Sequence, residues 1–126
     1  RTEDVVGFLA ENGVSKLEDL QTEGTPQNKA ATWIADIDRL HVPMSMKSKF
    51  IDRYVLTVLF FALGGDETWP GNANFLTPEH VCSWSRANQN ELGNVDISGV
   101  YECDYVDDEL RPLGISLGKL TILTLE

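Results

Sequence analysis

The sequence is short of cysteine, of histidine and of basic side chains, and each shortage excludes a class of protein. Two cysteines, Cys82 and Cys103, and two scattered histidines, His41 and His80, are too few for a zinc site built within this chain. There are 10 basic against 20 acidic residues, a net charge of -10. Nucleic acid and anionic lipid would meet like charge on such a surface, so we expect no nucleic-acid binding.

Long apolar runs are also missing. The longest one follows Arg53 and ends before Gly64, with Thr57 as its polar interruption. It is about half of the roughly 20 residues that cross a bilayer, so we predict a buried central helix and no transmembrane segment. Asp52 and Arg53 fall in the first turns of this helix, where we expect both charges to be hydrated. Gly64 should end the helix as a C-cap glycine.

The chain begins at Arg1 and shows no signal peptide. We interpret this start as a processed or trimmed product, so the missing targeting segment says little about the compartment. A length of 126 residues suits a single domain with its own core. The acidic charge is uneven, because residues 1–63 hold 7 basic and 9 acidic groups whereas residues 64–126 hold 3 and 11. We therefore expect the acidic surface in the second half.

The first half carries helix signals. Thr25 followed by Pro26 is the strongest, since threonine is a good N-cap and proline suits the first helical position. Apolar residues then recur at helical spacing, which predicts an amphipathic helix over about 26–40 that lies antiparallel to the central helix, with Trp33 in the core. Upstream, Ser15–Glu18 has the spacing of a capping box and predicts a short helix.

The second half changes in texture. Gly, Asn, Asp and Pro crowd residues 64–74, which predicts a structured loop. A second Thr-Pro pair at Thr77 predicts a short helix through Trp84, and residues 87–93 have the composition of an exposed polar segment. Apolar and polar residues alternate from Val95, as in a strand. The sequence thus predicts an α/β fold, with a mainly helical N-terminal part followed by a short β-hairpin. Spacing alone leaves open whether the two cysteines form a disulfide or remain buried thiols.

Two short segments carry a family resemblance. Cys82-Ser83-Trp84 and, after a polar interval, Gly99-Val100-Tyr101-Glu102-Cys103-Asp104 resemble the Cys-x-Trp and Gly-Val-x-Cys segments of N-terminal caps in plant-type leucine-rich repeat proteins. The leucines at 117, 120, 123 and 125 look like the first repeat behind such a cap, and residues 25–66 are similar to the helical lead-in of the algal branch. Residues 111–115 give only a compressed form of the expected Asn-x-Leu-x-Gly-x-Ile-Pro run.

The resemblance implies an organisation. Residues 1–24 would be a helical lead-in, residues 25–76 an antiparallel helical pair with the Gly/Asn/Pro loop, and residues 77–126 a cap hairpin with the strand of one leucine-rich repeat. It also implies that Cys82 pairs with Cys103, and a disulfide in turn implies an oxidising compartment, either extracellular or an organelle lumen. With one repeat, the chain is either a fragment of a longer solenoid or a cap that has become a free-standing domain.

Six residues are candidates for partner binding. Trp69 and Trp84 stand in loop and short-helix contexts, where we expect partly exposed rings. The acidic cluster could gather calcium through its oxygens, but it lacks the EF-hand spacing, so we interpret it as a solvated, partner-facing loop without a metal. Its members are Asp104, Asp107, Asp108 and Glu109.

The function implied by the resemblance is non-catalytic: protein binding or structural capping of a leucine-rich repeat array, with no cofactor. One alternative is an extrinsic subunit docked peripherally on the lumenal or extracellular face of a membrane complex. A third, less favoured reading is a metal-assisted hydrolase that uses Asp104–Glu109. That reading lacks a nucleophile or basic partner, because His80 and Cys82 point away from each other on a helix and His41 stands alone. We expect His80 to have a capping or surface role instead.

Overall fold

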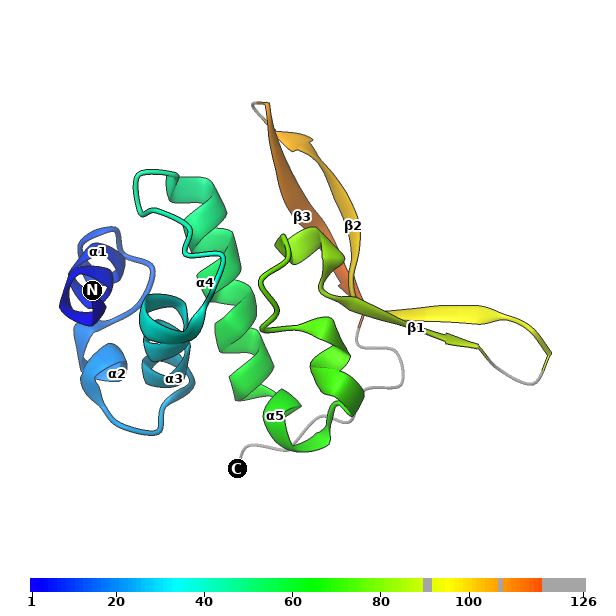
Figure 1. Cartoon of the computed structure of the whole chain (residues 1–126). Coiled ribbons are helices and arrows are strands. Elements are labelled where there is room, and N and C mark those ends of the chain that lie inside the picture. The colour runs from blue at the N-terminus through cyan, green and yellow to red at the C-terminus, as the bar shows by residue number, and fades with distance from the viewer. Residues whose placement is uncertain (90–91, 107, 117–126) are drawn as a thin grey trace. The chain divides into compact units, whose positions relative to one another are not determined.

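The computed structural model describes residues 1–89, 92–106 and 108–116 (Figure 1). Helices dominate the first half and a three-stranded antiparallel sheet follows, which confirms the predicted α/β class. The chain separates into two compact units, Arg1–Ala62 and Leu63–Glu126. The three-segment organisation implied by the resemblance stays a prediction, and the leucines at 117, 120, 123 and 125 lie outside the described residues.

The first unit is built from helices. They are α1 (Thr2–Glu11), α2 (Leu17–Gln21), α3 (Pro26–Thr32) with its π-helical continuation η1 (Trp33–Ile37), and α4 (Lys47–Ala62). The predicted pair is antiparallel: the Lys29 ammonium in α3 lies over the Phe61 ring near the end of α4, whereas Trp33 lies against Arg53, two turns earlier. Trp33 is buried, as predicted.

Helix starts in this unit follow the sequence only in part. Thr25 caps α3 as predicted, because its Oγ1 accepts a hydrogen bond from the Asn28 amide at 3.0 Å. The capping box predicted at Ser15–Glu18 is wrong, since no side chain caps α2. The Ser15 hydroxyl is instead hydrogen-bonded to the Tyr54 hydroxyl of α4 at 2.8 Å. A tertiary partner has replaced the local one.

The central helix is less uniformly buried than its composition suggests. Val55 is 48% exposed and Leu59 is half-buried, whereas the polar residues Arg53 and Thr57 are 1% and 0% exposed. The prediction that Arg53 is hydrated is therefore wrong, and the predicted buried helix leaves Val55 exposed. Aliphatic residues of α4 face outward while a guanidinium occupies the interior.

Asp38 explains the burial of Arg53. The guanidinium donates from Nε to Asp38 Oδ2 at 2.6 Å and from Nη2 to Oδ1 at 2.8 Å. Asp38 is 5% exposed, and its Oδ1 also accepts from the Leu40 amide at 3.0 Å. On another side the guanidinium carbon lies 5.2 Å from the centre of the Trp33 ring. Bidentate pairing and ring stacking together offset the cost of removing the two charges from water.

Titration of the Tyr54 hydroxyl should make the stability of the first unit depend on pH in the alkaline range. Burial raises the pKa of its hydroxyl above the ordinary 10.0, the hydrogen bond with Ser15 lowers it and the Asp19 charge raises it. Above about pH 10 the unfolded chain then loses this proton while the folded chain keeps it, so the free energy of unfolding should fall as pH rises. We expect Tyr54→Phe to remove this loss in urea titrations between pH 9 and 11, and Tyr105→Phe, at an exposed position, to retain it. Equal slopes for the wild type and Tyr54→Phe would contradict the assignment.

The second unit begins with a left-handed glycine. Gly64 has φ 73°, ends α4 as the predicted C-cap glycine and starts the short α5. Its remaining elements are α5 (Gly65–Thr68), η2 (Pro70–Asn74), η3 (Val81–Ser83), β1 (Ser85–Gln89), β2 (Val95–Val106) and β3 (Glu109–Ser116). The helix predicted after Thr77 is reduced to the single turn η3, because the Thr77 hydroxyl donates to the Asn74 carbonyl, at 3.3 Å, instead of capping a helix.

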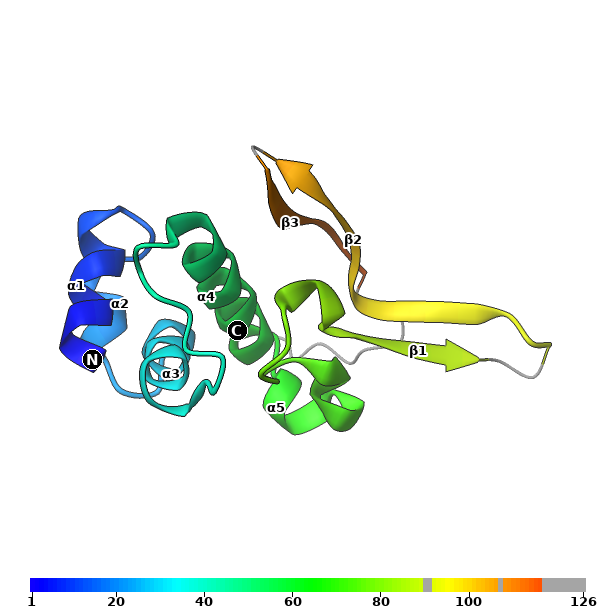
Figure 2. The ribbon, with the colours of Figure 1, turned by 45° about the horizontal axis from the view of Figure 1, so that its top comes forward.

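The sheet is organised by its long middle strand. The first half of β2 pairs with β1, from Gly99 opposite Ser85 to Val95 opposite Gln89, and its second half pairs with β3. Register shifts between Val100 and Cys103 accompany a bend, so that two arms diverge along β2 (Figures 1 and 2). Residues 87–89, predicted to be an exposed polar segment, belong to β1, because β2 supplies an edge to which even a polar sequence can bond.

Three aromatic side chains form the core beside this sheet. The Phe75 ring lies between two tryptophans, 5.3 Å from Trp69 and 5.2 Å from Trp84 between ring centres. Trp69 is 4% exposed and Trp84 0%. The prediction that these two rings are partly exposed is wrong, and a buried ring offers no face to a partner.

Candidate functional site

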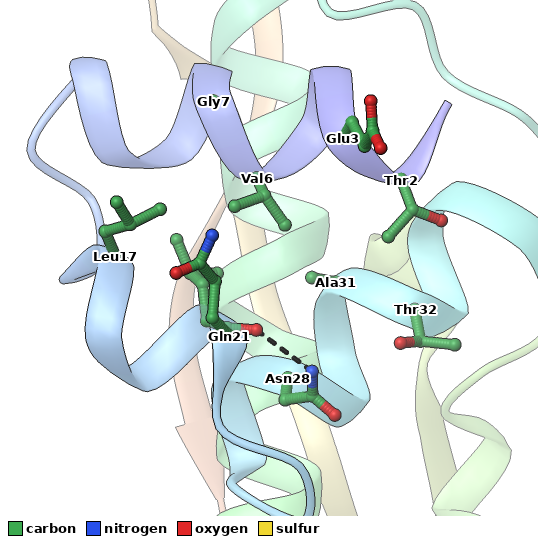
Figure 3. A pocket seen from close by; sticks show the side chains of 10 residues that line it. Thr2, Glu3, Val6, Gly7, Leu17, Gln21, Asn28, Ala31 and Thr32 are labelled. Atoms are coloured by element: carbon green, nitrogen blue, oxygen red, sulfur yellow. Dashed lines mark hydrogen bonds between the residues drawn. The ribbon is translucent and has the colours of Figure 1, made fainter.

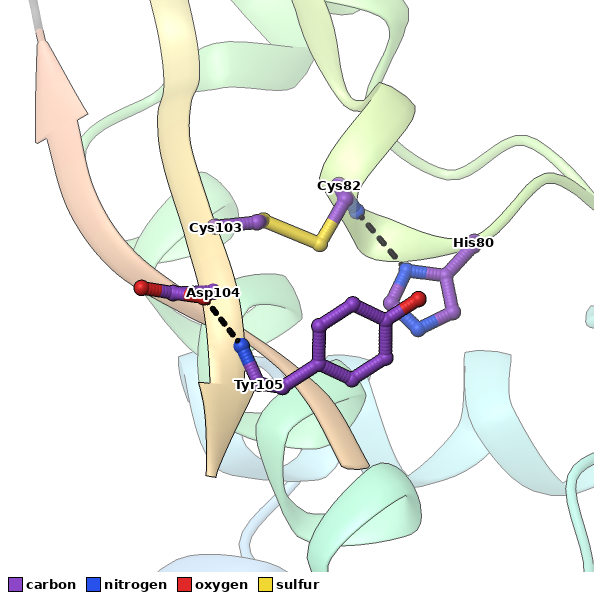
Figure 4. Close-up of a disulfide and its surroundings, with 5 residues drawn as sticks. All are labelled: His80, Cys82, Cys103, Asp104 and Tyr105. Atoms are coloured by element: carbon purple, nitrogen blue, oxygen red, sulfur yellow. Dashed lines mark hydrogen bonds between the residues drawn. A yellow bond between two sulfur atoms is a disulfide. The ribbon is translucent and has the colours of Figure 1, made fainter. Parts of the chain in front are cut away.

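The disulfide is the covalent anchor of the second unit. Cys82 in η3 is bonded to Cys103 in β2, with 6.1 Å between their Cα atoms, as the resemblance implied (Figure 4). His80 caps η3, since its Nδ1 accepts a hydrogen bond from the Cys82 amide at 3.0 Å. The predicted capping role of His80 is thus confirmed. The disulfide at Cys82 holds η3 to the sheet.

A second contact joins the same two segments. The Val100 amide donates to the Trp84 carbonyl at 2.9 Å. Beside it Gly99 has φ 109°, and a Cβ there would lie 2.4 Å from the Trp84 oxygen and 2.9 Å from the Ser85 Cα. Only glycine permits this approach of the two backbones. The Cys-x-Trp and Gly-Val segments are therefore locked together by a covalent bond and by close backbone packing.

We expect reduction of the disulfide to destabilise the second unit. Closing a loop across a sequence separation of 21 restricts the unfolded chain, and its opening should lower the free energy of unfolding by about 3 kcal/mol. Urea titration with and without dithiothreitol measures the difference. The Cys82→Ala/Cys103→Ala double variant should show the lower stability and no response to the reductant. A loss below about 1 kcal/mol would contradict the entropic argument.

The strands β2 and β3 expose an unusual amount of apolar surface. Tyr105 is 70% exposed, Val95 60%, Tyr101 55% and Leu113 54%. Exposed apolar side chains that gather on one part of a protein mark interaction surfaces. We call the eight residues of these strands that are more than a third exposed the apolar strand surface: Val95, Ile97, Tyr101, Tyr105, Val106, Leu110, Leu113 and Ile115. These residues are not all on one face of the sheet, since Tyr105 and Val106 are consecutive in β2.

The bend of β2 hollows part of this surface. A shallow depression of about 460 Å³ is lined by Val95, Ile97, Tyr101, Ile115 and Ser116. The Tyr101 ring packs directly against Gly114. A Cβ built at that glycine would lie only 2.7 Å from the ring. Residues of both arms therefore line one shallow depression, whose surface is part polar and part apolar.

The predicted acidic residues lie around the far turn of the β2–β3 arm. Asp104, Asp108 and Glu109 are exposed, and Asp104 Oδ1 accepts from the Tyr105 amide at 2.7 Å. Asp108 has φ 65°, as a turn residue can. Asp107 lies outside the described residues. Within the described ranges, no three His, Cys, Asp or Glu side chains converge in a way that could hold a metal ion.

Of the six predicted partner residues, the structure therefore exposes three acids and buries both tryptophans. The sequence analysis missed the apolar strand surface. The available signal was the apolar pair Leu113 and Ile115, two positions apart in a segment with strand-type spacing. In the described part of the chain, no helix is long and apolar enough to cross a bilayer.

Comparison with protein-family models, curated proteins and solved structures finds no match to this chain. Its function has to be argued from the contacts and exposures above.

Proposed function

We propose that this chain is a non-catalytic protein-interaction module whose second unit caps a leucine-rich repeat array. The observation that carries the proposal is the apolar strand surface, above all Leu113 and Ile115, which are 54% and 38% exposed in β3. A repeat stack buries a continuous apolar core between successive repeats. A cap must therefore present apolar strand residues on the side that contacts the first repeat. We assign no residue a catalytic role.

The clamp between the motif segments supports the same proposal. A cap closes a stack only if it is itself rigid, and here the disulfide of Cys82 and Cys103 and the Val100–Trp84 hydrogen bond tie η3 to β2. The disulfide also supports an oxidising compartment for this protein. We propose an extracellular location or an organelle lumen.

A second candidate is an accessory subunit docked on a larger membrane complex. It is favoured by the exposed carboxylates of Asp104, Asp108 and Glu109, which closure of a repeat stack does not require. On this reading the apolar strand surface and these three carboxylates contact a basic surface of the partner. The opposite charges would speed association.

A chimera tests the capping function. Consensus plant-type leucine-rich repeats without their own cap are fused after Glu126, in an oxidising host. We expect a monomeric fusion that unfolds cooperatively with its repeats, because the apolar end of the array is covered. The variant Leu113→Asp/Ile115→Asp should abolish this effect. Ile37→Asp, which places the same charge at a 61% exposed position of the first unit, should preserve it.

The two candidates give different results in this experiment. Repeats that aggregate equally with and without this chain would exclude capping. If the Leu113→Asp/Ile115→Asp change has no effect on a soluble fusion, the apolar strand surface is not the contact and the capping proposal fails. Salt-sensitive binding to a membrane complex that is lost on neutralising Asp104, Asp108 and Glu109 would favour the accessory subunit.

A further inference from the structure

The first unit contains a groove of its own, between α1, α2 and α3 (Figure 3). Its volume is about 550 Å³, within the range of roughly 300–1,000 Å³ that binding sites occupy. Apolar side chains from all three helices form the floor and one wall: Val6, Leu17, Leu20 and Ala31. Polar groups surround them: Thr2, Glu3, Gln21, Asn28 and Thr32.

Gly7 is part of the lining of this groove. It lies inside α1, where glycine costs about 1 kcal/mol relative to alanine. Its φ is not positive, and a Cβ built on it would meet no atom within 4 Å. Neither the backbone nor the packing among the described residues therefore requires glycine here. The missing side chain instead flattens the groove wall and leaves space for an occupant.

The charge of the groove is one-sided. Glu3 is the charged residue of its lining, and beside it the Thr2 hydroxyl donates to Asp36 Oδ2 at 3.0 Å. The carboxylates of Glu3 and Asp36 thus lie near Thr2 on α1. On α2 the groove is instead lined by the apolar side chain of Leu17, which is 49% exposed. Residues 1–32, which contain the three helices, hold six acidic and three basic side chains, and one of the basic ones, Arg1, donates to the Val42 carbonyl at 2.8 Å. An occupant matched to this site is apolar along its length and cationic at one end.

We propose that this groove is a second binding site, which takes a segment of a partner protein carrying aliphatic side chains beside a lysine or arginine. The aliphatic groups would fill the space over Val6, Leu17 and Ala31, and the cation would face Glu3 and Asp36. A second copy of this chain is a poor occupant, because two copies with a net charge of -10 repel each other. The site is separate from the apolar strand surface and does not depend on the capping function.

A random library of 16-residue peptides displayed on phage, selected against the whole oxidised chain, tests the proposal. We expect enriched peptides to combine aliphatic residues with lysine or arginine. Gly7→Leu fills the groove and should weaken their binding by at least about tenfold. Glu3→Gln should weaken it about twofold to fivefold, as expected for one exposed ion pair, and added salt should do the same. Ser45→Leu, which adds the same side chain at an exposed position outside the lining, should change nothing.

A second variant that fills the groove shows whether a loss of binding in Gly7→Leu arises from misfolding. Thr32→Leu fills the groove from α3, at an exposed position, and circular dichroism checks that both variants keep the helices. The proposal is overturned if no peptide is enriched, if the enriched peptides are acidic or uncharged, or if folded Gly7→Leu and Thr32→Leu bind them like the wild type. Peptides lost on Leu113→Asp/Ile115→Asp and retained by the groove variants would report on the apolar strand surface instead, and would also overturn it.

Discussion

Replacing Asp38 by alanine should lower the free energy of unfolding by about 3 to 5 kcal/mol. Arg53 is 1% exposed and its guanidinium binds both Asp38 oxygens, at 2.6 and 2.8 Å. Without the carboxylate the positive charge stays buried and loses both hydrogen bonds of the ion pair, while the Trp33 ring offers a far weaker contact than a carboxylate. The Leu40 amide loses its acceptor as well. Urea titration followed by circular dichroism measures the change.

Two control variants separate the ion pair from charge in general. Glu23→Ala removes an exposed carboxylate of the same unit and should change stability by less than about 0.5 kcal/mol. The double variant Asp38→Leu/Arg53→Met removes both charges and should come within about 2 kcal/mol of the wild type, because no unpaired charge remains buried. If the double variant is as unstable as Asp38→Ala, the loss arises from packing and not from the broken ion pair.

Gly99→Ala should cost at least about 3 kcal/mol, because a new Cβ adds a steric clash to an unfavourable φ. The Cβ would lie 2.4 Å from the Trp84 oxygen, where neither side can move without breaking the Val100–Trp84 hydrogen bond. Urea titration again measures the loss, and faster hydrogen exchange at the Val100 amide should accompany it.

Gly24→Ala is the matched control for this variant. Gly24 has φ 88°, but a Cβ there would meet nothing within 4 Å, so it carries the backbone strain without the clash. We expect a loss of about 1 to 2 kcal/mol from Gly24→Ala. Equal losses at the two glycines would show that the close approach at Gly99 contributes nothing.

Local signals in the sequence were sufficient where the partner lies nearby in the chain. The Thr25 N-cap, the Gly64 C-cap and the cap by His80 each involve residues within a few positions, and all three form. The cysteine pairing followed from the resemblance of two segments, since spacing had left it open. The three helix caps depend little on the rest of the fold.

Long-range partners could not be found in this way. Arg53 looks like a hydrated residue of a first helical turn until Asp38, 15 positions away, is brought to it. Ser15 leaves its predicted capping role for a hydroxyl 39 positions away. Trp84 has polar neighbours in sequence, yet Phe75 packs on it in the folded unit. Each of these outcomes depends on tertiary contacts that outweigh local preference.

The acidic turn and the proline of β3 have a consequence for solubility. An exposed strand rich in apolar side chains is a template for edge-to-edge aggregation into fibrils. Pro112 lies within β3 and has no N–H, so it interrupts the row of backbone donors along that strand. Carboxylates of Asp108 and Glu109 stand where the strand begins, and identical chains repel each other through them. We therefore expect Pro112, Asp108 and Glu109 to oppose aggregation of β3 with a second copy of the same strand.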